Sequence, residues 1–537
     1  MIDARQLLIL THRYLGIAIS LMFVVWFASG IAIIYAGDMP RLDPSLRLER
    51  MPPLALSKIK LSPAQAIQRL ESAEAAAEPS GANSARQTAS RAGAGRITLL
   101  TITDRPAYRV EGSMSGTIFA DNGELLGRIG PDTARTVASR FIALPEDRIH
   151  FVETLDEPDQ WTLGRARDMP MHRFQVDDDR ASELYVSGVS AEVSVLTTRK
   201  QRTLAWIGTI PHWLYFAALR VNQPLWYKIV VGLSALGCVL AVLGLILAFT
   251  QFLRVRPFRL SAAIPYRGLM RWHYISGAIF GVFALTWVFS GLLSMEPFDW
   301  TNAQGLEIRR DALSGGPPDL SSFDAMDSSA LTAAVSGRSI KEIGFVRIQG
   351  QDYYSVRATE STQGAQNPAE RRHEPYAIGR GEPDRTLVHA ATMSVHRDPF
   401  STESIVTRLA AAAPGAQIVE QQLLQEYDSY YYSRGGQAPL PVLRVKFNDP
   451  AETWFYVDPR GSEILAQVHR LSRLERWLYN GLHSLDFSFW YGRRPLWDIG
   501  VIVLCLGGLA TSSFGLYLGF KRLIRDLRPT SAIELPD

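Results

Sequence analysis

Four stretches of the sequence are long and apolar enough to cross a lipid bilayer. They lie at about 7–36, 228–252, 273–294 and 497–520, and each holds about 20 mostly apolar residues, the length that a hydrocarbon core requires. The whole chain of 537 residues is only 47% hydrophobic and 20% charged, so its apolar residues are concentrated in these windows. The sequence therefore predicts a multi-pass membrane protein with four transmembrane helices.

The first window has one alternative interpretation, a signal peptide with Arg5 and Arg13 as its basic flank. Its apolar part, from Leu15 to Tyr35, is longer than the usual apolar region of a signal peptide, which is about 7–15 residues. A near copy of the same stretch also occurs far inside the chain, where no cleavage is expected. We therefore expect a retained helix.

Basic residues gather at one end of the windows. The segment 254–271, between the second and third windows, carries five arginines and no acidic residue, and the segment 521–529 after the last window is also basic. By the positive-inside rule, both termini and the short loop lie in the cytoplasm. The long segments 37–225 and 295–495 are then expected outside it, which in a Gram-negative bacterium means an inner-membrane protein facing the periplasm.

Composition excludes several kinds of site. The formal net charge is only +3 and no basic stripe is interleaved with aromatic residues, so we expect no nucleic-acid partner. The two cysteines, Cys238 and Cys505, lie in different apolar windows, and neither a C-x-x-C-H motif for covalent haem nor a cysteine cluster for zinc or iron–sulfur occurs.

The chain carries an internal repeat. The stretch HRYLGIAISLMFVVWFASG at 12–30 returns as HYISGAIFGVFALTWVFSG at 273–291, which pairs His12 with His273 and Gly16 with Gly277. His212 and His483 each precede a Pro-Leu-Trp sequence and then the second or fourth window. We therefore predict two parallel, pseudo-symmetric halves, each running helix, exterior domain, histidine-bearing interfacial segment and helix.

The exterior segments have the signals of an α+β fold. Residues 62–77 have helical periodicity, 96–112 alternate like strands, 116–130 read as strand, Asn-Gly turn and strand, and 452–468 as strand, turn and strand. Residues 78–95 and 360–373 have loop composition. The predicted divisions are helix 7–36, exterior domain 37–209, interfacial segment and helix 210–254, loop 255–270, helix 271–294, exterior domain 295–479, interfacial segment and helix 480–520, and tail 521–537.

Several of these motifs resemble a known family. FYVDPRGSEIL at 455–465 resembles the strand–turn–strand of the PepSY domain, and LYVSGVSAEVSVL at 184–196 is a degenerate version of it. GLHSLDF followed by PLW and a glycine-containing helix resembles the PepSY-associated transmembrane family, as does HRYLGI at the start of the first helix. The resemblance implies PepSY-like exterior domains. Members of this family include inner-membrane reductases that hold two b-type haems and pass electrons to periplasmic ferric siderophores.

Four of the ten histidines occupy repeated positions on the helices or at their edges. One helical face carries His12, Gly16, Ile19, Phe23, Trp26 and Gly30, and a glycine one turn after the histidine would leave room for a flat macrocycle. Neutral imidazole is a standard axial ligand of haem iron. A single such histidine is usually a polar interfacial residue, and a single glycine usually marks helix packing, but their repetition favours cofactor binding.

Topology decides how the histidines pair. His12 and His273 are both expected at the cytoplasmic ends of their helices, whereas His212 and His483 both precede helices that begin at the exterior face. A pair within one half would have to span about 30 Å of bilayer, too far for one porphyrin. We therefore predict two haem b groups with iron held by His12 and His273 and by His212 and His483, and with Gly16 and Gly277 beside the first.

Two other features have weaker interpretations. His389 and His396 are seven residues apart and could share a helix face that holds a metal or meets the substrate. The tyrosine-rich run at 426–433 reads as a strand with an aromatic face or as part of a docking surface.

The function that these expectations favour is transmembrane electron transfer through the two haems, from a cytoplasmic donor to a periplasmic acceptor. The resemblance implies a haem-dependent oxidoreductase whose acceptor is a ferric siderophore or other iron chelate. No glycine-rich dinucleotide fingerprint or flavin-binding stretch is recognisable, so the donor is expected to be a separate cytoplasmic flavoprotein reductase or quinol. The alternatives are a membrane-anchored PepSY binding or inhibitory module, and a siderophore or iron transporter. The transporter is disfavoured because the windows lack the interior acidic or lysine residues that mark ion pathways.

Overall fold

The computed structural model describes residues 3–77, 95–112, 114–253, 264–301, 305–309, 311–360, 385–433 and 438–527. The chain divides into two compact units. The first, here called the helical unit, consists of Met1–Met39, Lys200–Ala303 and Leu471–Asp537. The second, here called the sheet unit, consists of Pro40–Arg199 and Gln304–Arg470.

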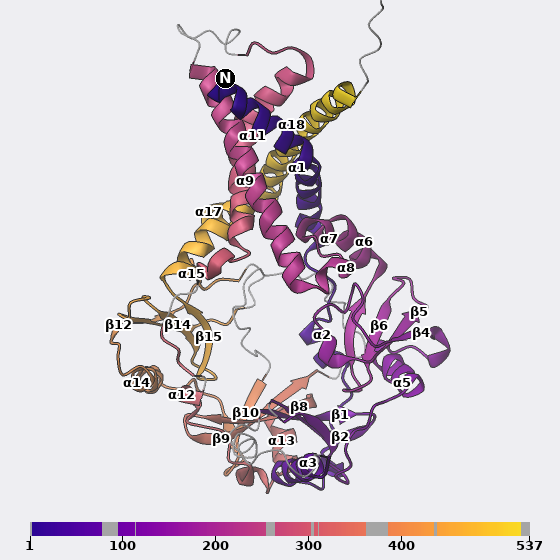
Figure 1. Ribbon diagram of the computed structural model, residues 1–537. Coiled ribbons are helices and arrows are strands. Elements are labelled where there is room, and N and C mark those ends of the chain that lie inside the picture. The colour runs from indigo at the N-terminus through magenta and orange to yellow at the C-terminus, as the bar shows by residue number, and fades with distance from the viewer. Residues whose placement is uncertain are drawn as a thin grey trace, which may run out of the picture. The chain divides into compact units, whose positions relative to one another are not determined.

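The helical unit is built on four long helices (Figure 1), α1 (Ala4–Ala36), α9 (Gln223–Leu253), α11 (Gly268–Leu293) and α18 (Leu496–Leu527). All four are long and apolar enough to cross a membrane. This result confirms the four predicted windows, and each helix begins before its window. Most of the apolar residues in each helix are not buried in the protein, which is the arrangement expected when lipid covers them.

The long helices pack against one another around a small apolar core. Helix α1 lies against α18 and α9, and α11 lies against α9 and α18. Close approach depends on glycines: a Cβ atom at Gly237 would lie 2.9 Å from Val288, and one at Gly508 would overlap the ring of Phe27. The buried core residues are Ile19, Phe23, Phe27, Leu240, Trp287, Val288, Trp497, Val501 and Cys505.

Short helices lead into the second and fourth long helices. Helix α9 follows α6 (Arg199–Ile207), α7 (Thr209–Trp213) and α8 (Ala217–Arg220). Helix α18 follows α15 (Arg470–Glu475), the π-helix η6 (Arg476–Gly481), α16 (Leu482–Ser484) and α17 (Ser488–Tyr491). The histidine-bearing segments predicted ahead of these long helices are therefore helical, and each consists of several short pieces.

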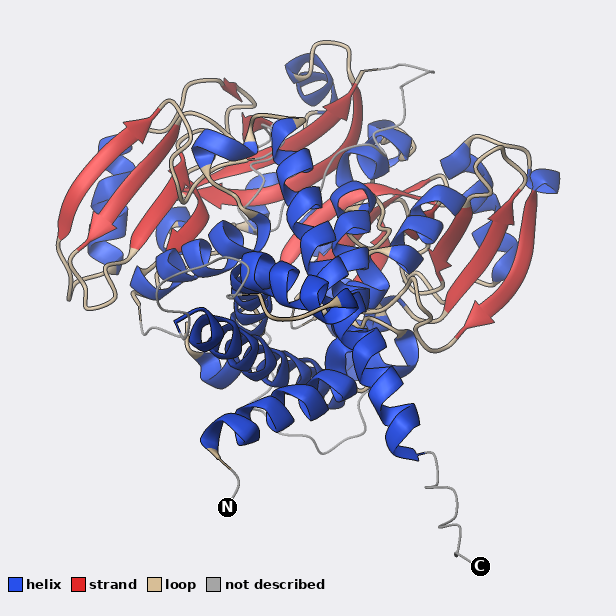
Figure 2. Cartoon of the chain, turned by 90° about the horizontal axis from the view of Figure 1, so that it is seen from above, coloured by secondary structure: helices blue, strands red, loops and turns tan. Residues whose placement is uncertain are grey.

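The sheet unit contains three antiparallel sheets, drawn in red in Figure 2. The strand orders are β11-β10-β9-β8-β1-β2-β3, β4-β5-β6-β7 and β12-β13-β14-β15. The strands are β1 (Arg96–Ile102), β2 (Arg105–Glu111), β3 (Gly116–Phe119), β4 (Ile149–Leu155), β5 (Met171–Val176), β6 (Glu183–Ser187), β7 (Val193–Thr197), β8 (Ser339–Ile348), β9 (Gln351–Thr359), β10 (Arg385–His389), β11 (Val395–His396), β12 (Ile418–Leu424), β13 (Val442–Phe447), β14 (Trp454–Asp458) and β15 (Glu463–Val468).

Helices flank these sheets. The longer ones are α2 (Pro44–Arg50), α3 (Pro63–Ala77), α5 (Pro131–Ile142), α13 (Ser328–Ala334) and α14 (Thr402–Ala412). Buried side chains of α5, namely Ala134, Ala138 and Phe141, pack on the sheet of β4–β7. Ile405 and Leu409 of α14 belong to the apolar cluster that includes strands β13 and β14. Each four-stranded sheet is thus covered by one amphipathic helix.

The seven-stranded sheet joins the two halves of the chain. Strand β1 pairs with β8, with Leu99 opposite Ile343 and Leu100 opposite Glu342. The predicted division into exterior domains at 37–209 and 295–479 therefore runs through a shared sheet. Both segments contribute to one apolar core, in which Leu99, Tyr108 and Tyr354 are fully buried.

A chain of ion pairs crosses the same junction. Arg47 of α2 contacts Glu192 and Glu342, each at 2.7 Å, while Arg109 also binds Glu192 and Arg357 lies 3.0 Å from Glu342. Burial opposes ionisation of Glu192, but Arg109 and Arg47 outweigh it and hold its pKa below the ordinary value. The Glu192 carboxylate therefore remains charged and paired with both arginines.

Several local predictions can be compared with these elements. The helix predicted at 62–77 and the strand–turn–strand at 452–468 are confirmed as α3 and as β14 and β15. The second strand predicted within 116–130 is wrong, because after one bridge between Ile118 and Leu125 the chain turns through glycines into α5. The loops predicted at 78–95 and 360–373 lie outside the described residues, except for residues 95 and 360.

The tyrosine-rich run at 426–433 and the histidines of the sheet unit, His389 and His396, also differ from expectation. Residues 426–433 form no strand; Tyr431 is buried there and its hydroxyl donates to the carbonyl of Pro439. His389 and His396 lie on strands β10 and β11, so the shared helix face predicted for them is wrong. Their spacing of seven residues reflects a hairpin, in which strand alternation replaces helical periodicity.

Candidate functional site

The structure brings the four repeated histidines of the helical unit together in two pairs. The ring centres of His12 and His273, here called the first pair, lie 6.4 Å apart. Those of His212 and His483, here called the second pair, lie 6.1 Å apart. Each histidine therefore has as its neighbour the residue at the corresponding position of the other half of the chain.

Helix packing holds the first pair. Nδ1 of His12 on α1 lies 3.3 Å from the carbonyl oxygen of Leu240 on α9, and Nδ1 of His273 on α11 lies 3.0 Å from that of Thr511 on α18. A Cβ atom at Gly244 would approach the His12 ring to 2.9 Å, and one at Gly515 the His273 ring to 3.0 Å. Each ring therefore reaches a neighbouring helix because that helix has glycine one turn after the carbonyl.

The second pair lies on short helices and is held from α1 and α11. Nδ1 of His212 on α7 lies 3.2 Å from the carbonyl oxygen of Trp26 and 3.1 Å from Ser29 Oγ. Nδ1 of His483 on α16 has the same two contacts, at 3.1 Å from the Trp287 carbonyl oxygen and 3.0 Å from Ser290 Oγ. Each imidazole is thus held by a carbonyl group and a hydroxyl group of one spanning helix.

Matching features hold the backbone of these two short helices. Leu214 and Leu485, two residues after the histidines, have φ of 51° and 49°, a left-handed conformation that is uncommon for leucine and ends each short helix. Trp226 Nε1 donates to the carbonyl of Trp213 at 3.0 Å, and Trp497 Nε1 donates to that of Ser484 at 3.1 Å. The indole rings of the Pro-Leu-Trp sequences therefore tie down the residue after each histidine.

These contacts decide which ring nitrogen is free. A carbonyl oxygen only accepts hydrogen bonds, so Nδ1 of each histidine carries the hydrogen in the neutral ring. Nε2 then has a lone pair, and among the residues that the structure describes it has no hydrogen-bond partner in either pair. For His212, which lies outside the four spanning helices, burial and the nearby His483 lower the pKa to about 4. Neutral imidazole with a free Nε2 is the form that binds metal ions.

The two pairs lie near opposite ends of α1. His12 is close to its start, whereas Gly30, beside the His212 ring, is close to its end. Eighteen residues of helix separate these positions, which corresponds to about 27 Å. Aromatic side chains occupy the interval, with ring centres 6.2 Å apart for Phe23 and Phe27 and 5.9 Å apart for Phe27 and Trp287.

The predicted glycines Gly16 and Gly277 do not border the imidazole rings. A Cβ atom at Gly16 would have Ser20 and Leu240 as its nearest neighbours, and one at Gly277 would lie 3.6 Å from Thr511. Both glycines therefore contact the helices that supply the carbonyl groups of the first pair. Whether they also border a cofactor stays a prediction.

The residues present fit a haem held through two imidazoles. A bond between a metal ion and an imidazole nitrogen is about 2 Å long, so two rings on opposite sides of one ion have centres roughly 6 Å apart. Both observed separations, 6.4 and 6.1 Å, agree with this value. Within the described part of the chain, no group of three or more His, Cys, Asp or Glu residues is placed to bind a metal ion. A planar ligand that supplies the other donors itself suits such two-histidine sites.

The remaining histidines lie in other surroundings. His172 is buried in the sheet unit and both ring nitrogens have partners, Thr154 Oγ1 and the Ile129 carbonyl oxygen, each at 2.9 Å. It is therefore a satisfied core residue. His389 and His396 both contact the ring of Tyr353, with ring centres at 5.2 and 5.7 Å. His150 is exposed on β4.

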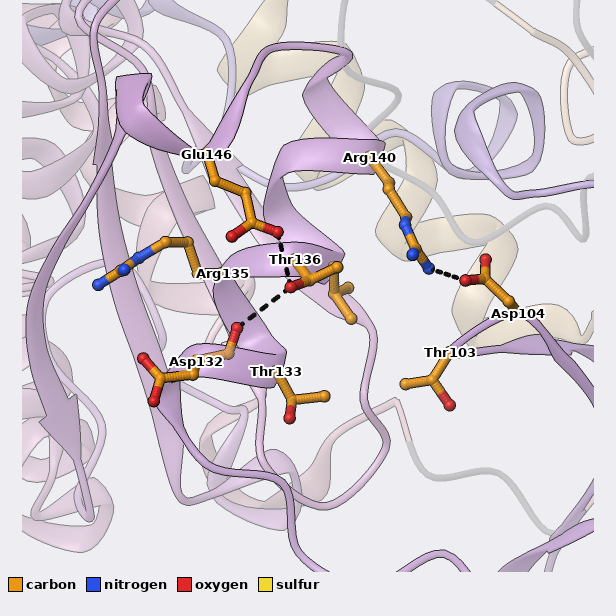
Figure 3. A pocket seen from close by; sticks show the side chains of 9 residues that line it. Thr103, Asp104, Asp132, Thr133, Arg135, Thr136, Arg140 and Glu146 are labelled. Carbon is orange, nitrogen blue, oxygen red and sulfur yellow. Dashed lines mark hydrogen bonds and ion pairs between the residues drawn. The ribbon is translucent and has the colours of Figure 1, made fainter.

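Figure 3 shows a hollow in the sheet unit, between α5 and the turn that joins β1 and β2. Its lining is polar: Thr136 donates to Glu146 at 2.7 Å and Arg140 pairs with Asp104. Asp104 and Arg140 are both half exposed to solvent, so this ion pair contributes little to stability. The hollow lacks histidine and aromatic residues and has no common feature with the histidine pairs.

The sequence analysis did not predict two kinds of residue that contact the histidine pairs. Ser29 and Ser290 contact the second pair, and Gly244 and Gly515 border the first. All four lie at positions that match between the two halves of the sequence, so the repeat contained the signal. Their roles were not predictable, because repetition does not reveal which residues of neighbouring helices meet.

Comparison with known proteins agrees with this architecture. No curated protein matches the chain. The family model of the PepSY-associated TM region matches residues 9–522, from the start of α1 almost to the end of α18. The match includes all four histidines and both units. This membrane protein therefore belongs to the PepSY-associated transmembrane family.

Proposed function

We propose that this protein carries electrons across a membrane through two b-type haems and delivers them to an iron chelate, with a ferric siderophore as the favoured acceptor. The observation that carries the proposal is the pair of matched two-histidine sites near opposite ends of the same helices. In each site the rings are spaced for one metal ion, and Nε2 is left free by the contacts of Nδ1.

In this proposal His12 and His273 hold one haem, and His212 and His483 hold the other. A haem b would supply a reversible one-electron couple between ferric and ferrous iron. A haem held by two imidazoles would be suited to electron transfer rather than to oxygen binding. The carbonyl groups and serine hydroxyls at Nδ1 orient the imidazoles, and the aromatic core between the two levels excludes water.

The two halves are, in this view, parallel repeats related by an axis along the membrane normal. The repeated contacts support this arrangement: Leu240 and Thr511 serve the first pair, while Ser29 and Ser290 serve the second. Charge distribution supports an inner-membrane location with both termini in the cytoplasm. The first pair would then face the cytoplasmic donor, a flavoprotein reductase or quinol, and the second the exterior acceptor.

Absorption spectroscopy tests the proposal directly. Protein purified from haem-replete cells should be red, with a b-type reduced-minus-oxidised spectrum and about two haems per chain. Stopped-flow mixing of the reduced protein with a ferric hydroxamate chelate should then reoxidise the haems as ferrous iron is released. A folded, colourless preparation would overturn the proposal. A red preparation that no ferric chelate reoxidises would overturn the choice of acceptor alone.

A further inference from the structure

Both serines at the second pair donate to a backbone carbonyl of their own helix. Ser29 is 1% exposed and its hydroxyl donates to the carbonyl of Val25 at 2.6 Å. Ser290 is fully buried and its hydroxyl donates to the carbonyl of Trp287 at 3.0 Å. Because the hydroxyl hydrogen of each serine is already engaged, its oxygen can only accept from the histidine beside it. Each Nδ1–H is therefore shared between a hydroxyl oxygen and a carbonyl oxygen.

The first pair has no such side chain. Nδ1 of His12 and of His273 each meets one backbone carbonyl oxygen, and no described side chain accepts from either ring. Acceptors at the second nitrogen of an imidazole ligand fix its orientation and raise its basicity. The chemical environments of the two pairs therefore differ by one acceptor per ring, although their ring separations are nearly equal.

We propose, on the basis of the proposed function, that Ser29 and Ser290 are positioning residues which orient His212 and His483 and lower the reduction potential of iron at the second pair. A more basic imidazole is a stronger donor to the metal, and it stabilises ferric iron more than ferrous iron because the ferric ion carries the greater charge. The serines thus favour release of the electron from the second pair to an acceptor.

The test uses the full-length protein with only the second site occupied, which His12→Ala provides. In this background Ser29→Ala and Ser290→Ala should each shift the midpoint potential of the remaining haem in the positive direction. Each should also weaken haem retention by about tenfold to a hundredfold, as measured by transfer to apomyoglobin. Ser29→Thr keeps the hydroxyl and should restore the potential.

Ser276→Ala is the matched control. Ser276 is also buried on a spanning helix and its hydroxyl donates to the carbonyl four residues earlier, at 2.8 Å, but it touches no imidazole nitrogen. It should leave the potential of the second site unchanged. The inference is overturned if Ser29→Ala and Ser290→Ala leave that potential unchanged, or if Ser276→Ala shifts it equally. An absence of haem from the unmodified protein would instead overturn the proposed function itself.

Discussion

The two histidine pairs reach nearly the same ring separation by different means. In the first pair the histidines belong to spanning helices and are held by carbonyl groups across a helix contact, at positions where glycine permits the approach. In the second pair the histidines belong to helices of five and three residues. They are held by carbonyl groups and serine hydroxyls of α1 and α11, and tryptophans bind the residue after each histidine. The first geometry therefore depends on how the long helices pack, whereas the second also depends on individual side chains.

The largest effect is expected from replacing the histidines themselves, because each replacement should remove the haem of one pair and leave that of the other. His12→Ala or His273→Ala should remove one haem and leave the second site occupied, whereas His212→Ala or His483→Ala should do the reverse. Haem per chain should fall from about two to about one, because a six-coordinate site loses an axial ligand. Pyridine haemochrome assays and reduced-minus-oxidised spectra measure this change.

His150→Ala provides the control for these variants, since His150 is exposed on β4 and should be replaceable without loss of haem. A result in which His12→Ala and His212→Ala remove the same haem would show that the pairs are not separate sites.

A smaller effect is expected where glycine borders the first pair. Gly244→Val should push the His12 ring away from the Leu240 carbonyl, since even a Cβ atom would lie 2.9 Å from that ring. Overpacking of this kind costs about 1–3 kcal/mol, so haem affinity at the first site should fall by about 10- to 100-fold. Titration of the apoprotein with haem measures the loss.

Gly232→Val is the matched control on the same helix. No atom would lie within 4 Å of a Cβ at Gly232, so the haem affinity should change little. Equal losses from Gly244→Val and Gly232→Val would show that the loss at Gly244 does not come from contact with the His12 ring.

The smallest effect is expected from the tryptophans of the second pair. Trp226→Phe and Trp497→Phe keep an aromatic ring but remove the N–H group that binds the Trp213 or Ser484 carbonyl. One such hydrogen bond contributes about 1 kcal/mol, so haem retention at the second site should weaken about fivefold. The low-temperature electron paramagnetic resonance signal of that site should broaden, while the first site keeps its signal. Identical broadening at both sites would contradict the view that the two histidine pairs are held independently of each other.

The spanning helices and the histidine pairing were predictable from sequence because both follow from simple regularities. Lipid requires long apolar windows, and a parallel repeat places matching residues at the same depth. The immediate partners were not predictable. No pattern near His12 indicates the Leu240 carbonyl, since that contact depends on how α1 and α9 pack. The left-handed backbone conformation of Leu214 was also not predictable, because leucine is not a residue typical of turns.

In the sheet unit, too, local structure was predictable from sequence but long-range contacts were not. Local strand pairs such as β14 and β15 follow from short-range alternation and a turn. The pairing of β1 with β8 joins strands far apart in the chain, with the two spanning helices α9 and α11 between them, and no local signal indicates it. His389 and His396 were assigned to a helix for a related reason, since one spacing suited both a helix and a hairpin.

The pairing of β1 with β8 also constrains how the protein can be made. Residues 96–102 are synthesised well before residues 339–348, and the helices α9 and α11 are made in the interval. Until β8 appears, β1 is the open edge of a partial sheet, and such edges invite pairing with other chains. Assembly of the sheet unit must therefore wait for synthesis of the third spanning helix, and a ribosome that stalls before residue 339 would leave an unfinished, aggregation-prone segment.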